Sequence, residues 1–138
     1  MQKVLRISND ISNLSLVNRF LEETGEAFGW SADWMMKLLL VMEEAVSNVI
    51  FYAYDKEGYI HITLTYESGL LSVTISDRGK AFDPTAKEDP DITLSAEERP
   101  IGGLGIFLIK QIMDEVVYKR EGGENILVMT KNLDHINK

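Results

Sequence analysis

The chain has 138 residues, of which 45% are apolar and none is Cys, and its formal net charge is −8. This length and apolar content predict a single domain spanning residues 1–138, and the lack of Cys excludes disulfide frameworks and thiolate zinc sites. The acidic balance argues against nucleic acid or an anionic membrane as the main partner, and no apolar stretch is typical of a signal peptide or a transmembrane helix, so we expect a cytoplasmic protein.

The N-terminal segment predicts a short strand followed by a helix. Apolar residues over 4–7 are strand-like, and Ser8-Asn9-Asp10 can cap the helix that follows. Apolar residues then recur at helical spacing, and the pattern fades near Gly25, where we expect this helix to end.

A second, longer helix is predicted over residues 34–54, with Ser31 or Asp33 as its cap. The segment has no Pro or Gly and is too long for a strand, and its apolar residues leave little room for a wetted face. Four polar residues interrupt it, and spacings of three and four predict that they share one face. Burying such groups is costly unless they are paired or bind a ligand, so a solvated seam, an interhelical hydrogen bond and a ligand site are all open. The four residues are Glu43, Glu44, Ser47 and Asn48.

The second half of the chain predicts two hairpins separated by a long irregular segment and a helix. Alternating, β-branched sequences mark the strands, and Gly-containing turns join them. The irregular segment, 78–103, holds all three prolines and is too long for an ordinary connection, which is typical of a lid or a binding loop. The predicted elements are strands at 59–66 and 70–77, a helix at 104–113, and strands at 116–120 and 125–131.

This order of elements predicts an α+β fold. Hairpins imply a mixed but mostly antiparallel sheet, and only three helices are available to cover it. We therefore expect a two-layer α/β sandwich with three helices on one face of the sheet.

Two further motifs accompany the polar residues of the long helix. Asp77-Arg78-Gly79 ends a predicted strand, where a carboxylate can accept a hydrogen bond from an amino group while the backbone turns closely past a ring. Gly102-Gly103-Leu104-Gly105 opens a predicted helix, where free N–H groups favour anions. Taken singly, each motif is equally typical of a plain turn or a tight helix start.

Together, the order and spacing of the three motifs resemble the Bergerat-fold (GHKL) ATP-binding domains, which include histidine kinases and type II topoisomerases. An acidic helix face with Glu and Asn four apart is followed by a strand-ending Asp-x-Gly, a long loop and Gly-Gly-Leu-Gly at a helix start. The resemblance covers about residues 4–131. It implies the Bergerat fold, with the segment at about 78–103 as an ATP lid.

Within that superfamily the chain resembles the RsbW-type anti-sigma-factor serine kinases. The similar sequences are Glu-Ala-Val-Ser-Asn in the long helix, Gly-Lys-Ala-Phe-Asp-Pro after the strand Asp, and Arg-Pro-Ile-Gly-Gly-Leu-Gly-Ile before the last helix. Such proteins bind ATP, phosphorylate a serine of a STAS-domain anti-anti-sigma partner, bind a sigma factor alternatively and commonly form homodimers. The resemblance therefore implies an ATP-dependent protein serine/threonine kinase with ATP and Mg²⁺ as cofactors.

The resemblance also implies a role for each motif residue. Asn48 would ligate Mg²⁺, and Glu44, one turn earlier, would be the general base. Asp77 would bind the adenine amino group, and Gly79 would let the ring approach. Thr130, on the last strand, would reach the adenine pocket. Backbone N–H groups for the phosphates would come from Gly103, Leu104, Gly105 and Ile106.

The chain departs from the family pattern at several positions. Tyr52-Ala53-Tyr54 stands where the family often has His-Gly-Tyr or His-Ala-Tyr, and Phe107 stands where the last helix often carries His. Lys80 and Ala81 occupy positions where some relatives have another Gly. These differences leave the role of the missing His residues open, without touching the residues assigned to ATP.

Three cationic residues lie near the predicted functional surfaces. Arg19 is on the first helix, which flanks the partner-binding surface of the family, and Arg99 and Lys110 flank the predicted phosphate loop. A solvated surface position is favoured for Arg19 over a partner or phosphate contact, and neutralisation of phosphate charge by Arg99 or Lys110 is left open.

Two other functions remain open at this point. The chain is alternatively an ATP-gated protein-binding module without efficient phosphoryl transfer, although the presence of Glu44 favours the kinase. It is also alternatively a stand-alone histidine-kinase-type catalytic domain, whose phosphoacceptor His would have to lie on another chain.

Overall fold

The computed structural model describes residues 1–53, 56–86 and 103–134. None of the described helices is long and apolar enough to span a membrane. The strands are β1 (Gln2–Ser8), β2 (Tyr59–Glu67), β3 (Leu70–Asp77), β4 (Glu115–Glu121) and β5 (Glu124–Asn132). The helices are α1 (Leu14–Phe28), α2 (Ala32–Asn48) and α3 (Gly103–Ile112), with 3-10 turns at Ile11–Asn13 and Pro84–Ala86 and a π-helical turn at Val49–Ala53.

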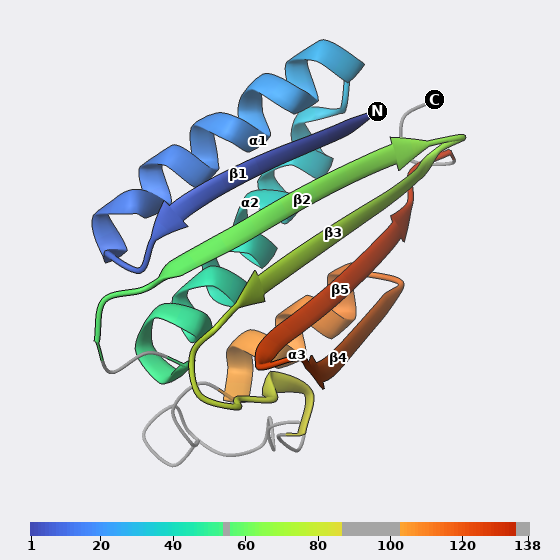
Figure 1. The fold of residues 1–138 in the computed structure, drawn as a ribbon. Coiled ribbons are helices and arrows are strands. Elements are labelled where there is room, and N and C mark those ends of the chain that lie inside the picture. Colours follow the sequence, from blue (N-terminus) through green and yellow to red (C-terminus); the bar gives the residue numbers. More distant parts are fainter. Residues whose placement is uncertain (54–55, 87–102, 135–138) are drawn as a thin grey trace.

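The five strands form one sheet in the order β1-β2-β3-β5-β4, and the three α-helices pack on one of its faces (Figure 1). Each of the four strand pairings in the described residues is antiparallel. The predicted α+β two-layer architecture is therefore confirmed, with an antiparallel rather than a mixed sheet. The end of α2, the end of β3 and the start of α3 lie at the same end of the molecule, which brings the three sequence motifs together.

The period-2 pattern of the strands fixes which side chains face the helices. Along β3, Leu71, Val73 and Ile75 are buried under the helices, while the alternate residues are only partly buried. Asp77 has the same parity as these three apolar residues and is 2% exposed. The strand pattern therefore forces a carboxylate into the interface between sheet and helices.

The first helix continues past the predicted end at Gly25, which lies inside α1. A Cβ at Gly25 would overlap the sulfur of Met35, so the glycine there serves close packing of α1 against α2 and not helix termination. Gly29, with φ +67°, ends the helix instead, in the left-handed conformation that glycine adopts without strain.

The long helix begins as predicted, because the Ser31 hydroxyl oxygen accepts a hydrogen bond from the Trp34 backbone N–H at 3.1 Å. Most of its apolar residues are buried as predicted, but one face is wetted, since Met36 is 66% exposed. The α-helix also gives way to a π-helical turn after Asn48. This turn contains Ala53, whose carbonyl oxygen accepts a hydrogen bond from the Lys80 N–H at 2.8 Å.

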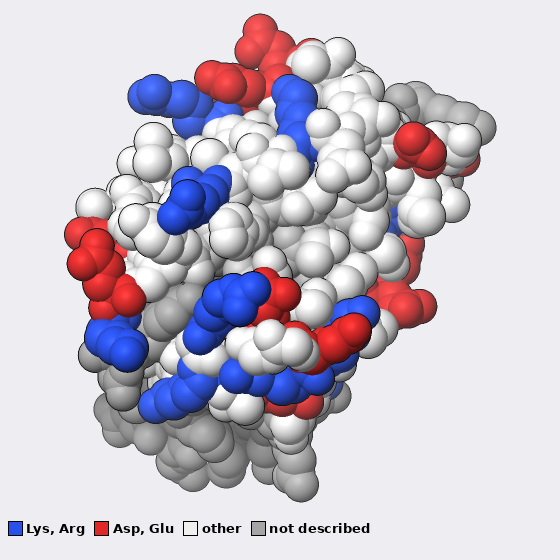
Figure 2. All heavy atoms as spheres, viewed as in Figure 1, with Lys and Arg blue, Asp and Glu red and all other residues white. Residues whose placement is uncertain are grey.

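The other face of the sheet carries no helix, and Figure 2 looks onto it. Lys and Arg side chains gather over its lower part, although the net charge of the chain is −8. The Arg6 guanidinium carbon lies 3.8 Å from the centre of the Tyr59 ring. Both residues line a hollow of about 410 Å³, together with Lys56, Glu57, Gly58, His61 and Arg78. The acidic net charge therefore does not describe this face.

The burial of α2 predicts a difference between two leucines on the same helix. Leu38 is fully buried, whereas Leu40 is 38% exposed. Leu38→Ala should lower the free energy of unfolding by about 2–5 kcal/mol, because it leaves a cavity in the core. Leu40→Ala, the matched control, should lower it by less than about 1 kcal/mol. Urea unfolding monitored by circular dichroism measures both, and equal losses would contradict the assigned orientation of α2.

Candidate nucleotide site

Asp77 is held in place by two hydrogen bonds at the end of β3. Its Oδ1 accepts from the Gly79 backbone N–H at 2.8 Å and from the Asn125 Nδ2 at 2.9 Å. Asn125 is the first residue of β5 whose side chain faces the helices, and it lies opposite Asp77 in the strand register. None of the hydrogen bonds among the described residues uses Asp77 Oδ2, so this oxygen of a residue that is 2% exposed is available to a ligand donor.

Burial raises the pKa of the Asp77 carboxyl above its ordinary value, because a buried carboxylate loses solvation. The hydrogen bonds from Asn125 and Gly79 and the positive charge of Arg120 act in the opposite direction and favour the ionised form. Arg120 also donates from its guanidinium to the Gly79 carbonyl oxygen at 2.8 Å. The hydrogen bonds and Arg120 therefore offset part of the free-energy cost of burying the Asp77 carboxylate, but not all of it.

Asn125 was not identified as a site residue from the sequence. The signal was present, because Asn125 has the same parity as the buried Leu127 and Met129 and is itself 5% exposed. A polar residue at an inward-facing strand position is costly to bury, so it should have been paired with the other inward-facing polar residue, Asp77.

A small cavity lies beside Asp77, between the sheet and the end of α2. Its volume is about 20 Å³, which is room for about one water molecule and far less than a nucleotide site occupies. Phe82 and Pro84, from the segment after β3, cover it, and the Phe82 ring stacks on Tyr52 at a centroid distance of 5.3 Å. A purine base can therefore enter only if these covering residues move. The lining is Ala45, Asn48, Val49, Ile75, Asp77, Phe82, Pro84, Tyr118, Asn125 and Leu127.

Gly79 is required by the close approach of this segment to the π-helical turn. A Cβ at Gly79 would overlap the backbone oxygen of Ala53, and the next residue, Lys80, donates its N–H to that same oxygen. Because the atom in the way is backbone, a larger residue would push the segment away from α2 and from the cavity. The role predicted for Gly79, close approach to a ring, stays a prediction.

The polar residues of α2 meet the start of α3. Asn48 is 8% exposed and lines the cavity with Asp77, and no hydrogen bond of its side chain is found among the described residues. One turn earlier, the Glu44 carboxylate lies so close to Gly105 that a Cβ there would overlap Oε2. The first N–H groups of α3, which begins at Gly103, have no partner within the helix and favour anions.

The four polar residues of α2 do not form the single stripe that we predicted. Glu43 is exposed and faces α1, whereas Glu44 faces α3, because neighbouring positions on a helix differ by about 100°. The structure thus joins Glu44 and Asn48 to the site and separates Glu43 from it.

Thr130 does not reach the cavity, contrary to what the resemblance implied. It pairs with Ser72 and Glu115 and alternates with the buried Leu127 and Met129, so its side chain lies on the sheet face opposite the helices. The inward-facing polar residue of β5 at the cavity is Asn125 instead.

The other residues named from the sequence lie on α1, on α3 or outside the described residues. Arg19 is exposed on α1, and Lys110 is exposed in the last turn of α3. Ile106 is fully buried, so only its backbone is available to a phosphate. Leu104 lies in the first turn of α3. Arg99 and most of the predicted lid, 87–102, lie outside the described residues.

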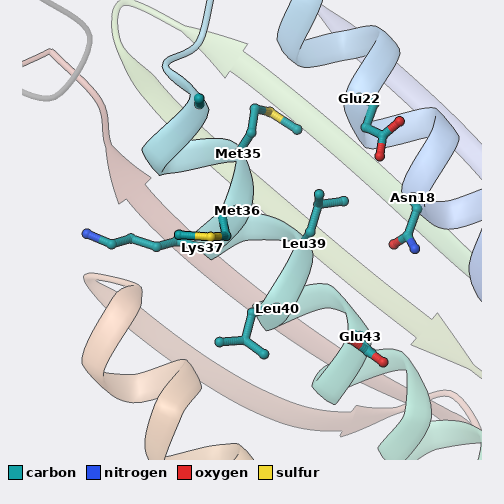
Figure 3. Close-up of a pocket in the computed structure, with 9 residues that line it drawn as sticks. Asn18, Glu22, Met35, Met36, Lys37, Leu39, Leu40 and Glu43 are labelled. Carbon is teal, nitrogen blue, oxygen red and sulfur yellow. The ribbon is translucent and has the colours of Figure 1, made fainter.

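A wider groove lies apart from this site, on the outer side of α1 and α2 (Figure 3). Its volume is about 770 Å³, and its apolar lining comes from the exposed face of α2. Glu43 lies in it, with Asn18 and Glu22 on α1 opposite. The groove contains none of the residues that surround Asp77, so it is a separate surface.

Residues 7–131 match the model of the histidine kinase-like ATPase domain. The chain belongs to this family. The match spans all three motifs, including Glu44 and Asn48 on α2, Asp77 on β3 and Gly105 on α3.

Curated relatives place the chain beside serine kinases of this family. It is 32% identical over 105 residues to the serine/threonine-protein kinase BtrW of Bordetella bronchiseptica, covering 75% of this chain and 74% of that protein. It is 33% identical over 112 residues to the serine-protein kinase RsbW of Listeria monocytogenes, covering 77% and 71%. The resemblance to the RsbW-type branch, and with it the enzyme class of its relatives, is confirmed.

Solved structures support the same fold. The RsbU and RsbW domains of a Mycobacterium tuberculosis protein match with a TM-score of 0.68 at 15% identity, covering 96% of this chain and 32% of that one. A blue-light activated histidine kinase of Erythrobacter litoralis matches with a TM-score of 0.58 at 18% identity, covering 78% and 33%. At these identities the likeness concerns the fold alone.

The raised pKa of Asp77 predicts a cost to stability. Because the folded pKa lies above the unfolded one, the free energy of unfolding falls as pH rises through the folded pKa and stays lower at neutral pH. Asp77→Asn keeps an oxygen for the Gly79 and Asn125 donors but removes the buried charge. The variant should therefore be more stable than the wild type at pH 7, and this difference should shrink at a pH below about 4.

Urea unfolding at both pH values measures this difference in stability. Glu57→Gln, which removes one charge from an exposed side chain, is the control for net charge. If Asp77→Asn is less stable than the wild type at pH 7, the buried carboxylate is not a cost to the fold and the pKa assignment is wrong.

Proposed function

We propose that the chain is an ATP-dependent protein serine/threonine kinase that acts as an anti-sigma factor and phosphorylates a serine of a STAS-domain anti-anti-sigma protein. The observation that carries the proposal is the convergence of three motifs at one end of the fold. A buried acceptor, Asp77, lines the same cavity as Asn48, and Glu44 lies one turn away against the start of α3.

Asp77 supplies recognition of the base in this proposal. Its free Oδ2 accepts a hydrogen bond from the exocyclic amino group of adenine, while Oδ1 stays bonded to the protein. A guanine base has a carbonyl at the corresponding position, which would leave two acceptors facing each other. A buried polar site of this kind discriminates strongly against the wrong partner.

Asn48 fits a role as a magnesium ligand. The residue is 8% exposed, its side-chain amide has no hydrogen-bond partner among the described residues, and no cluster of three metal-ligating His, Cys, Asp or Glu residues is found there. Mg²⁺ is commonly held by one or two protein oxygens together with phosphates and waters, so a single amide is compatible with it. Bridging the phosphates and neutralising their charge is the chemistry that the ion supplies when bound.

The first turn of α3 binds the phosphates in this proposal. The backbone N–H groups of Gly103, Leu104, Gly105 and Ile106 are the ones that a helix leaves unpaired at its start. Gly105 has no side chain, so the phosphate chain can approach the helix beside Glu44.

Glu44 is the general base in the phosphoryl transfer. The serine hydroxyl oxygen of the partner bonds to the γ-phosphorus, the bond from that phosphorus to the ADP oxygen breaks, and the hydroxyl proton passes to the Glu44 carboxylate. The Glu44 carboxylate is placed one helical turn from Asn48, so it lies beside the phosphates without contacting the adenine ring. Its negative charge should repel the γ-phosphate, so binding of ATP does not depend on it.

The partners of this reaction follow from the proposal. The chain would bind a STAS-domain protein as substrate and a sigma factor as its alternative partner, in the cytoplasm, as a homodimer. The names of the relatives, which include serine-protein kinases called RsbW, support this assignment. The described part of the chain forms one sheet and one helical layer, which supports a single domain over 1–138.

The magnesium role of Asn48 predicts a loss that depends on the metal. Asn48→Ala should abolish the part of ATP affinity that requires Mg²⁺ and leave the weaker affinity measured in EDTA unchanged, because only the metal ligand is removed. Isothermal titration calorimetry in Mg²⁺ and in EDTA measures both. Ser47→Ala, at the neighbouring position of α2, is the control. An equal loss in both buffers, or no loss, would exclude the metal role.

The base role of Glu44 predicts a loss of transfer without a loss of binding. Glu44→Gln should retain ATP affinity and reduce phosphorylation of the STAS serine by roughly a hundredfold or more, the range typical of removing a general base. Glu43→Gln is the matched control, since it makes the same change one residue away on the face toward α1. Both are measured in single-turnover phosphorylation assays beside an ATP titration.

Two results would contradict this account. Wild-type transfer rates in Glu44→Gln would show that Glu44 is not the base. A wild-type protein that binds ATP but transfers phosphate to no STAS protein of its own genome would favour the alternative, an ATP-gated binding module.

A further inference from the structure

The side chain of Asn125 uses its full hydrogen-bonding capacity beside Asp77. Its Nδ2 donates to Asp77 Oδ1 at 2.9 Å and to the Lys80 carbonyl oxygen at 2.8 Å. Its Oδ1 accepts from the Phe82 backbone N–H at 3.1 Å and from the Tyr118 hydroxyl at 2.5 Å. An amide has two N–H donors and two acceptor lone pairs, so every position is filled.

These partners allow only one orientation of the amide. If it were turned over, its oxygen would face two acceptors, the Asp77 carboxylate and the Lys80 carbonyl, and its NH₂ group would face the Phe82 N–H. The side chain is also 5% exposed, so water cannot compensate for a lost partner. Asn125 is therefore a rigid donor aimed at Asp77.

The rigid amide determines which part of Asp77 a ligand can use. With Oδ1 occupied by the Asn125 and Gly79 donors, Oδ2 is the oxygen that Asp77 has left for a ligand in the cavity that it lines. The same amide holds Lys80 and Phe82 of the segment that covers the cavity. Asn125 thus fixes both the free oxygen of Asp77 and the position of the segment, Lys80 to Phe82, that lies next to it.

We propose that Asn125 is a positioning residue that sets the base selectivity of the site by holding Asp77 as a fixed acceptor. The inference rests on the proposed binding of ATP and goes beyond it, because it assigns selectivity to a residue of β5 that acts through another side chain. Without the amide, the Asp77 carboxyl can turn about its side-chain bonds and present either oxygen, or none, to the base. The selectivity for an amino group then disappears, even where binding persists.

Comparison of ATP with inosine triphosphate isolates this effect. The two differ at position 6 of the purine, where ATP carries an amino donor and inosine triphosphate a carbonyl acceptor. The wild type should prefer ATP by roughly a hundredfold or more, since the carbonyl would face a buried carboxylate oxygen. The ratio of the two affinities reports positioning, because a general loss of structure lowers both affinities and leaves their ratio unchanged.

Two substitutions of Asn125 and one control substitution on the same strand make the test. Asn125→Asp keeps the shape and the acceptor for Phe82 and Tyr118 but replaces the donor that faces Asp77, and Asn125→Leu removes all four bonds. In both, the preference for ATP should fall to about tenfold or less, near the small discrimination left without a specific hydrogen bond. Thr130→Val, on the same strand but with its side chain on the face opposite the helices, is the control and should keep the preference.

The outcomes separate this inference from the proposed function. A wild type that binds neither nucleotide overturns the proposed function and the inference together. A wild type that selects ATP, with Asn125 variants that keep the full preference, overturns the inference alone. Should both variants fail to fold, the wild type still decides it by NMR: the Asn125 side-chain amide protons should exchange slowly with and without ATP. Fast exchange in the ATP complex would show that the amide does not hold Asp77 there.

Discussion

The burial of one carboxylate, that of Asp77, is the constraint on which the arrangement of the site depends. Strand parity places it under the helices at 2% exposure, and a buried charge is costly unless hydrogen bonds compensate it. The compensation comes from Gly79 in its own loop and from Asn125 on β5, which brings the loop, β5 and the end of α2 around one cavity. A buried carboxylate surrounded by dedicated hydrogen-bond donors is typical of a binding site.

Helix α2 links this site to the rest of the fold. Its buried face, which includes Leu38 and Val46, packs in the core, and its other polar faces carry Glu44 toward α3 and Asn48 toward the cavity. The residues proposed for metal binding and proton transfer, Asn48 and Glu44, therefore both lie on α2, which packs beside the strand that carries Asp77.

Much of the fold could be predicted from the sequence because period-2 and helical patterns are local. The end of α1 could not, because Gly25 serves a contact with Met35 that lies beyond Gly29 along the chain. Motifs identified Glu44, Asn48, Asp77 and Gly105, which the structure brings to one end of the molecule.

The resemblance to the family was less informative about β5. Thr130 was expected at the cavity, but its parity places it on the open face, and Asn125 lies there instead. Parity alone would have corrected this, whereas the separation of Glu43 from Glu44 depends on where α1 and α3 pack.

The most direct test of the account is a crystal structure of the protein with Mg²⁺ and a non-hydrolysable ATP analogue. The account predicts the adenine amino group at about 2.7–3.2 Å from Asp77 Oδ2 and the Asn48 amide oxygen on the metal. A base bound away from Asp77 would contradict it.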